Sequence, residues 1–281
     1  MPSLSHTRYA VIGHPVAHSK SPWIHARFAE QTGQPITYEA ICAPVDGFAA
    51  QVEGFFAAGG GGLNVTVPFK LEAFDLARGH LSPRAQAAGA VNTLWMADGR
   101  LHGCNTDGVG LLNDLRRLGA RLAGARVLLA GAGGAARGIL LPLVEAGCAG
   151  IDIANRTPQR AVELAASFSA SAAGAVLRGS SYAELPANGH WDLVINATAS
   201  SLEDEAPPLP AGAYAPGALA YDLMYAARPT AFMRQASADG AAAVADGLGM
   251  LVEQAAESFF IWRGVRPDPA PVLAALRDLL A

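Results

Sequence analysis

One glycine-rich turn constrains the fold of this chain more than any other feature. The apolar run at 127–130 predicts a buried strand, and it leads into Gly131-Ala-Gly-Gly-Ala-Ala136, a G-x-G-x-x-A pattern that opens a predicted helix. Gly131 permits the tight turn, Gly133 lets the backbone approach a pyrophosphate, and Ala136 keeps helix and strand close. The N–H groups at the helix N-terminus would face the phosphates. The pattern favours a dinucleotide site over an ordinary glycine-rich turn.

Segments of strand and helix character alternate along the first part of the chain. Strands are expected at 8–12, 37–41 and 63–67, and helices at 22–32, 47–58 and 71–77. Residues 90–97 and 100–103 are expected to pair as a hairpin, because Asp98-Gly99 is a favourable two-residue turn. This alternation indicates an α/β lobe with a largely parallel sheet.

The same alternation continues beyond the glycine-rich turn. Strands are expected at 126–130, 150–154, 193–196 and 219–222, and helices at 135–146 and 161–169. Repeated strand–helix units joined by short glycine-bearing turns predict a doubly wound, Rossmann-type domain. The segment 201–217, which is rich in proline and acidic residues, is expected to be a surface loop.

The predicted fold is therefore α/β with two lobes, for which 281 residues are sufficient. Residues 1–107 would form a substrate-binding and catalytic domain, and residues 108–247 would form the nucleotide-binding domain. Helices expected at 108–118 and 248–263 would join the lobes. Residues 248–281 would complete the first lobe, with a last helix at 271–280 packed back on it.

The strand after the glycine-rich turn ends at Asn155-Arg156-Thr157, where the ribose of a dinucleotide would be read. A domain for NAD would normally place an acid there to accept from the ribose 2′-OH. Asp152 is close in sequence, but it lies mid-strand between two isoleucines, so we expect its side chain to point elsewhere. Arg156, with Arg160 one helical turn on, supplies guanidinium groups suited to a 2′-phosphate. NADP is therefore preferred over NAD as the cofactor. The alternative interpretation of Arg156 is a solvated arginine at a strand end without a role in binding.

A lysine and an aspartate stand at the starts of two predicted helices. Lys70 follows the strand at 63–67 and Pro68, and Asp107 in Asn105-Thr-Asp-Gly108 precedes an apolar-periodic run. Such a pair facing a cleft would suit proton transfer to an oxygen. The alternative is a surface ion pair worth under about 1 kcal/mol.

The segment His18-Ser-Lys-Ser-Pro22 precedes the first predicted helix. Ser21 fits the N-cap and Pro22 the first helical position, and no capping box accompanies them. Ser19 and Ser21 together would form an anion cradle large enough for a carboxylate; a plain serine cap is the alternative. His14 and His18 are four residues apart, but Pro15 between them argues against a helical metal pair, so no metal is expected.

Composition excludes several classes of protein. A net charge of −4 gives no basic stripe, which argues against a nucleic-acid partner. Cys42, Cys104 and Cys148 show no CxxC spacing, so neither a zinc site nor a disulfide framework is predicted. The sequence contains no run of eighteen apolar residues and no signal-peptide pattern at 1–10. We therefore expect a cytoplasmic protein without a membrane partner.

Several segments together resemble the shikimate dehydrogenase family. They are His18-Ser-Lys-Ser-Pro22, Asn64-Val-Thr-Val-Pro-Phe-Lys70, Ala88-Gly-Ala-Val-Asn-Thr93, Asn105-Thr-Asp-Gly108, Gly131-Ala-Gly-Gly134, Asn155-Arg-Thr157, Asn196-Ala-Thr198, Tyr221-Asp-Leu-Met-Tyr225 and Asp246-Gly-Leu-Gly-Met250 followed by Gln254. Each is a weak signal alone, but the set is specific and follows the family order from about residue 8 to residue 266.

The resemblance implies reversible, NADPH-dependent reduction of 3-dehydroshikimate to shikimate, on the route to chorismate and the aromatic amino acids. Lys70 and Asp107 would be the catalytic pair. The residues that would bind substrate, through its carboxylate or its ring hydroxyls, are Ser19, Ser21, Tyr225, Asn64, Thr66, Asn92 and Gln254. The residues that would hold NADP(H) are Gly131, Ala132, Gly133, Gly134, Ala135, Asn155, Arg156, Thr157 and Arg160, with Met224 and Gly247 near the nicotinamide.

Two alternatives to this activity remain open. One is a quinate/shikimate dehydrogenase of broader substrate or cofactor use, and the other is a non-catalytic NADP-sensing regulator on the same scaffold. The sequence departs from the family pattern at Cys104 and at Ala199-Ser-Ser201, neither of which is assigned chemistry. The expected partner is a small-molecule substrate, and the expected assembly is a monomer or a homodimer.

Overall fold

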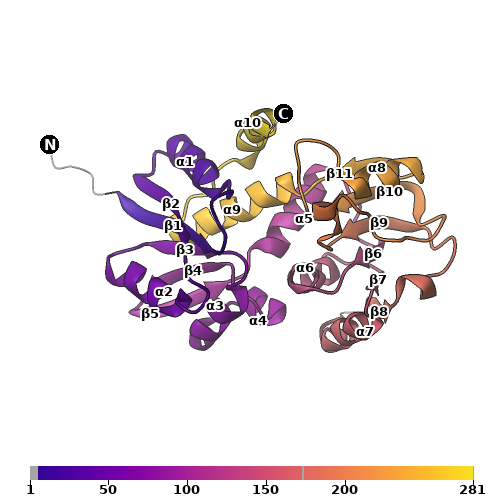
Figure 1. Ribbon diagram of the computed structural model, residues 1–281, viewed down its shortest axis with the longest axis horizontal. Coiled ribbons are helices and arrows are strands. Elements are labelled where there is room, and N and C mark those ends of the chain that lie inside the picture. The colour runs from indigo at the N-terminus through magenta and orange to yellow at the C-terminus, as the bar shows by residue number, and fades with distance from the viewer. Residues whose placement is uncertain (1–5, 173, 281) are drawn as a thin grey trace. The chain divides into compact units, whose positions relative to one another are not determined.

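The computed structural model describes residues 6–172 and 174–280 (Figure 1). The chain divides into two compact units. Unit 1 comprises Met1–Gly110 and Val252–Leu276, and unit 2 comprises Leu111–Leu251 and Arg277–Ala281. Helices α5 (Asp107–Arg117) and α9 (Leu248–Arg263) each contribute residues to both units. In the C-terminal helix α10 (Pro269–Leu280), Arg277 groups with unit 2, where its guanidinium pairs with Asp246.

Unit 1 is built on a five-stranded sheet in the order β2-β1-β3-β4-β5. Its strands are β1 (Thr7–Gly13), β2 (Ile36–Cys42), β3 (Gly62–Val65), β4 (Thr93–Ala97) and β5 (Arg100–Cys104). The first three strands are parallel, and β4 and β5 form the expected antiparallel hairpin. Asp98 and Gly99 make its turn with φ of 50° and 71°, which confirms the two-residue turn.

Helices α1 (Ser21–Thr32), α2 (Phe48–Ala57) and α3 (Lys70–Leu76) follow the parallel strands of unit 1, as predicted. Leu63 of β3 and Phe48 of α2 are fully buried and belong to one apolar core with Phe69. The short helix α4 (Pro83–Ala88) was not expected, because six residues are too few to show a helical period. The helices and the core hold the C-terminal ends of β1 and β3 in place.

Two local predictions in unit 1 were wrong. Ser21 is not the N-cap of α1: Lys20 takes that position with helical backbone angles, and Ser21 is the first helical residue. Proline is tolerated throughout the first turn because the N–H groups there have no helical partner, so Pro22 did not determine the start. The strand expected at 63–67 ends at Val65, because the Phe69 N–H bonds back to the Thr66 carbonyl and closes a turn. This turn leads directly into Lys70.

Unit 2 contains a six-stranded parallel sheet in the order β11-β10-β9-β6-β7-β8. Its strands are β6 (Arg126–Ala130), β7 (Gly150–Ala154), β8 (Val176–Ser180), β9 (Trp191–Asn196), β10 (Tyr214–Asp222) and β11 (Ala243–Ala245). From β6 the chain first builds outward to β7 and β8, and then returns to β9 on the other side. The doubly wound prediction is therefore confirmed, with the switch point between β6 and β9, where such folds bind ligands.

Helices α6 (Gly134–Glu145), α7 (Pro158–Ser167) and α8 (Ala231–Ala238) belong to unit 2. The edge strands β8 and β11 and helix α8 were not predicted, since each is too short to show a clear period. The loop expected at 201–217 was partly wrong, because β10 begins at Tyr214 and carries an irregularity before Leu219. Among the described residues, no helix combines the length and apolarity that crossing a bilayer requires.

Candidate functional site

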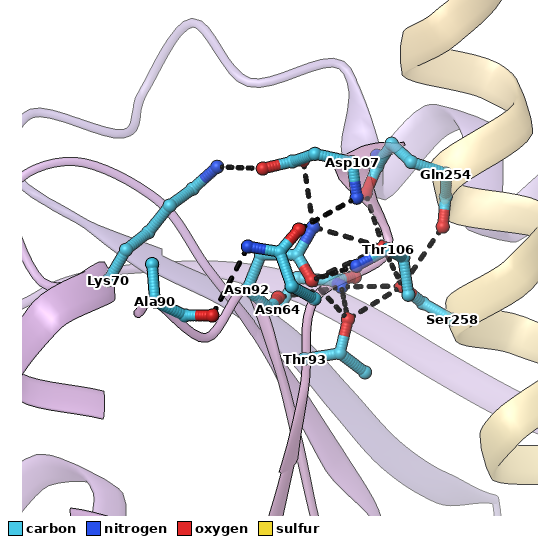
Figure 2. A network of polar contacts seen from close by, with 10 residues as sticks. Asn64, Lys70, Ala90, Asn92, Thr93, Thr106, Asp107, Gln254 and Ser258 are labelled. Carbon is cyan, nitrogen blue, oxygen red and sulfur yellow. Dashed lines mark hydrogen bonds and ion pairs between the residues drawn. The ribbon is translucent and has the colours of Figure 1, made fainter. Parts of the chain in front are cut away.

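Lys70 and Asp107 form the expected ion pair in unit 1 (Figure 2). Lys70 is the first residue of α3 and Asp107 the first of α5, and Lys70 Nζ lies 2.6 Å from Asp107 Oδ2. The lysine side chain is 30% exposed and the aspartate 16%, so the pair is accessible without being fully solvated. Asn92 Nδ2 donates to the other carboxylate oxygen at 2.9 Å. Both oxygens of Asp107 therefore have fixed partners.

Asn92 connects this pair to the loop before α5. Its Oδ1 accepts the Thr106 backbone N–H at 2.9 Å and the Thr93 hydroxyl at 2.9 Å, while its Nδ2 also donates to Thr106 Oγ1 at 3.0 Å. Asn92 is 3% exposed. A buried amide with this many partners has one orientation, so it fixes Asp107 relative to β4.

Asn64 occupies the corresponding position at the end of β3, and it is 6% exposed. Its Nδ2 donates to the Asn92 carbonyl at 3.2 Å, to Thr93 Oγ1 at 3.2 Å and to Ser258 Oγ at 2.9 Å (Figure 2). Its Oδ1 accepts the Tyr38 hydroxyl at 2.7 Å. The Asn64 amide nitrogen is thus directed into the protein, and one lone pair of Oδ1 remains for another donor.

The remaining predicted substrate residues of unit 1 lie on α9, in the turn after β3 and at the start of α1. Gln254 on α9 accepts from Thr106 Oγ1 at 3.3 Å, which joins it to the Asn92 network. Thr66, in the turn after β3, is half-buried. Ser21 is 7% exposed and its backbone N–H donates to Ser19 Oγ at 3.3 Å. The two serines therefore contact one another at the start of α1, as a cradle requires.

The glycine-rich turn in unit 2 has the geometry that the pattern predicted. Gly131 has φ of +105°, and a Cβ there would lie 3.0 Å from the Ala197 backbone, so glycine is required on two grounds. A Cβ at Gly133 or Gly134 would meet no atom within 4 Å, which leaves the turn open to an incoming group. Helix α6 begins here with Gly133 at its N-cap and no side-chain cap. The open turn and the uncapped helix start fit a pyrophosphate.

The residues after β7 fit the 2′-phosphate of NADP. Arg156 and Arg160 are exposed, and neither forms a salt bridge within 6–172 and 174–280. Asn155 Nδ2 donates to the Thr157 carbonyl at 3.0 Å, which shapes the loop that carries them. Asp152 instead accepts from Trp191 Nε1 at 2.7 Å, so its side chain points away from this loop, as expected.

Met224, Tyr225 and Gly247 lie on the segments after β10 and β11. The Gly247 N–H donates to the Met224 carbonyl at 3.0 Å, and a Cβ at Gly247 would lie 2.1 Å from the Leu223 carbonyl oxygen. Asp222 fixes the same segment by accepting the Met224 N–H at 3.0 Å. Gly247 therefore lets two backbone segments approach closely beside Met224.

Sequence reasoning missed several polar residues of the network in unit 1. These are Tyr38, Thr93, Thr106 and Ser258. Thr106 lies inside the Asn105-Thr-Asp-Gly108 segment and Thr93 beside Asn92, so adjacency was a usable signal. Tyr38 and Ser258 carried no such signal, because each lies alone in an ordinary strand or helix. No cluster of three or more potential metal ligands occurs within the part of the chain that the structure describes.

Three family models match successive parts of the chain. Residues 11–94 match the family model for the shikimate dehydrogenase substrate binding domain. Residues 115–203 match the model for shikimate / quinate 5-dehydrogenase, and residues 247–277 match the shikimate 5'-dehydrogenase C-terminal domain.

Close relatives cover almost the whole chain. The shikimate dehydrogenase (NADP(+)) of Bordetella avium is 68% identical over 98% of this chain and 96% of its own length, and that of Bordetella petrii is 66% identical over 97% and 96%. Shikimate 5-dehydrogenase from Thermus thermophilus, solved in complex with NADP(H) and shikimate, superposes with a TM-score of 0.83 at 39% identity, over 98% of this chain and 100% of that one. The chain belongs to the shikimate dehydrogenase family.

Proposed function

We propose that this protein catalyses the reversible, NADPH-dependent reduction of 3-dehydroshikimate to shikimate, a step of chorismate and aromatic amino acid biosynthesis. Relatives named for the NADP-dependent enzyme at 68% and 66% identity support this activity. The structural observation that carries the proposal is the Lys70–Asp107 ion pair, held at 2.6 Å beside a buried network of amide and hydroxyl groups.

The polar groups of unit 1 suit a small hydroxylated ring with one carboxylate. Ser19 and Ser21 would donate to the carboxylate, where the start of α1 adds its own N–H groups. The ring hydroxyls would contact Asn64, Thr66, Asn92 and Gln254. Asn64 would act as an acceptor, because its Nδ2 is already directed at three protein oxygens.

Lys70 and Asp107 would manage the proton of the reaction. Reduction of the 3-keto group leaves a developing alkoxide, which needs a proton and charge stabilisation. The Lys70 ammonium would donate the proton to the 3-oxygen, and Asp107 would hold the ammonium in position. In the oxidation direction Lys70 would accept the proton from the 3-hydroxyl group.

NADP(H) would bind to unit 2 and supplies the hydride when bound. Its pyrophosphate would lie on the turn from Gly131 to Ala135, and its 2′-phosphate would contact Arg156 and Arg160, with Asn155 and Thr157 shaping the loop. Met224 and Gly247 would lie near the nicotinamide. The open glycine turn supports this assignment, and so do the two arginines, which form no salt bridge with any residue that the structure describes.

One assay tests the activity against both alternatives. Initial rates should be measured with shikimate and with quinate, each with NADP and with NAD. The proposal expects shikimate with NADP to give the highest kcat/KM. Comparable rates with quinate would identify a broader quinate/shikimate dehydrogenase. Tight NADP binding without turnover of either substrate would identify a non-catalytic NADP sensor.

A further inference from the structure

Tyr38 lies on β2 and contacts the proposed substrate site through Asn64. Its hydroxyl donates to Asn64 Oδ1 at 2.7 Å. Burial raises the pKa of the Tyr38 phenol well above its ordinary value, and the nearby Ser21 side chain opposes that shift. The residue is half-buried, and its hydroxyl lies against the Asn64 side chain. The neutral hydroxyl therefore lies beside the amide that is expected to contact a ring hydroxyl.

A buried histidine holds the ring of Tyr38. His25, one turn after Ser21 on α1, stacks on Tyr38 with ring centroids 4.1 Å apart and an interplanar angle of 4°. His25 is 0% exposed, and neither of its ring nitrogens is hydrogen-bonded within 6–172 and 174–280. Burial lowers the pKa of His25 to about 3, with the adjacent Asn64 side chain opposing part of that shift. His25 is thus a neutral flat ring that fixes the plane of Tyr38.

The hydrogen bonds of Asn64, including the one from the Tyr38 hydroxyl, determine which of its atoms can contact a substrate. The Asn64 amide hydrogens are directed at the Asn92 carbonyl, Thr93 and Ser258 (Figure 2). Because Nδ2 already donates to protein oxygens, a ligand would contact Asn64 through Oδ1, which can accept two hydrogen bonds. Tyr38 donates one of these two hydrogen bonds. The stacking of His25 on the Tyr38 ring helps to hold in place the hydroxyl that donates to Asn64 Oδ1.

We propose that Tyr38 is a positioning residue for substrate binding, which holds Asn64 as a hydrogen-bond acceptor. The inference rests on the proposed function, since it takes shikimate as the ligand of this site. The hydrogen bond to Asn64 is present before the reaction and unchanged during it, so it contributes equally to ground state and transition state. Its loss should therefore appear in the KM for shikimate and not in kcat.

The test is Tyr38→Phe, which removes the hydroxyl and keeps the ring that stacks on His25. We expect the KM for shikimate to rise about tenfold, with kcat reduced less than about twofold and the KM for NADP unchanged within about twofold. The matched control is Tyr9→Phe, which alters a tyrosine directly across from Tyr38 in the β1–β2 register, stacked on Trp262 at 4.8 Å. The control should leave all three constants unchanged.

Two results would overturn the inference. In the first, Tyr38→Phe keeps a KM for shikimate within about twofold of the wild type. In the second, the KM values for shikimate and NADP rise together while the melting temperature falls, which is the signature of a structural role. If the wild type itself fails to oxidise shikimate with NADP, the proposed function and this inference fail together. If the wild type is active and Tyr38→Phe has the same KM for shikimate, the inference about Tyr38 fails while the proposed function stands.

Discussion

At the scale of single residues, the site depends on side chains whose chemistry has no close substitute. Lys20 and Lys70 are the only lysines in a chain that otherwise uses arginine for every basic position. An ammonium can exchange its proton during a reaction, whereas a guanidinium stays protonated. The lysine at position 70 therefore suits the proposed proton transfer, which an arginine could not perform.

Lys70→Arg separates these two roles. Arginine can keep the ion pair with Asp107 but cannot return a proton, so kcat should fall at least about 100-fold while the KM for shikimate changes less than about threefold. Steady-state rates in both directions measure this effect. The matched control is Arg78→Ala, which breaks an exposed pair with Asp75 near the end of α3 and should leave activity unchanged. An intact kcat with a large increase in KM would make Lys70 a binding residue.

Arg156→Ala tests the choice of cofactor. Loss of the charge-assisted hydrogen bonds to a 2′-phosphate, worth about 1.5–3 kcal/mol, should raise the KM for NADP about 10- to 100-fold. The KM for NAD should change less than about twofold, because NAD lacks that phosphate. The control is Arg178→Ala, which should leave both KM values unchanged. The Arg178 side chain on β8 is 72% exposed, and its guanidinium lies 3.7 Å from the Asp152 carboxylate on β7. Equal increases for both cofactors would contradict the assignment.

At the scale of elements, the ends of strands and the starts of helices position the chemistry. Lys70 begins α3, Asp107 begins α5, and the glycine-rich turn begins α6. The first turn of each helix is anchored by the core packing of the rest, so the functional groups stand on rigid supports. The close approach of the turn after β6 to Ala197, which follows β9, is possible only without a Cβ at Gly131.

Gly131→Ala should lower the stability of the protein and weaken its binding of NADP. Its φ of +105° is unfavourable for alanine, and the new Cβ would lie 3.0 Å from the Ala197 backbone, so the turn must shift. We expect a lower melting temperature and at least a tenfold increase in the KM for NADP. Gly124→Ala is the control: it has φ of +76° and open space around a Cβ, so it should lower the melting temperature alone. An unchanged KM for NADP in Gly131→Ala would exclude this turn from the site.

At the scale of the whole molecule, each unit has its own apolar core, and unit 1 also buries a histidine that must stay uncharged. In unit 1 the ring cluster of His25, Phe28, Tyr38, Phe259 and Trp262 joins α1, β2 and α9. A charged imidazole inside this cluster would be poorly solvated, and this is why burial lowers the pKa of His25. Acid should therefore weaken the folded state through His25.

The sign of this effect follows from proton binding in the two states. Between about pH 6.5 and pH 3 the unfolded chain protonates His25 and the folded chain does not, so the free energy of unfolding falls as the pH falls. The contribution at pH 5 relative to pH 7 is about 2 kcal/mol. His25→Phe keeps a ring at this position and removes the titration. Denaturant unfolding at pH 7 and pH 5 should show a smaller loss of stability for the variant; an equal loss would contradict the prediction.

Much of the fold was predictable because its signals are local. The turn from Val127 to Ala136 specifies strand, tight turn and helix within ten consecutive residues, and the hairpin at Asp98-Gly99 specifies its own register. The first helical residues Lys70 and Asp107 were also placed correctly to within a residue. Predictions failed where the signal was weak or ambiguous, as at the edge strands β8 and β11 and at the start of α1.

The sequence by itself determined the family, the α/β class, the glycine turn and the candidate acid–base pair, because each of these is written in neighbouring residues or in a short motif. Only the tertiary structure decided which groups satisfy the buried amides. Tyr38 meets Asn64 across 26 positions of the chain, and Ser258 meets it across 194. Contacts of that separation are set by how strands and helices pack, and packing, unlike a turn, leaves no pattern in the residues on either side.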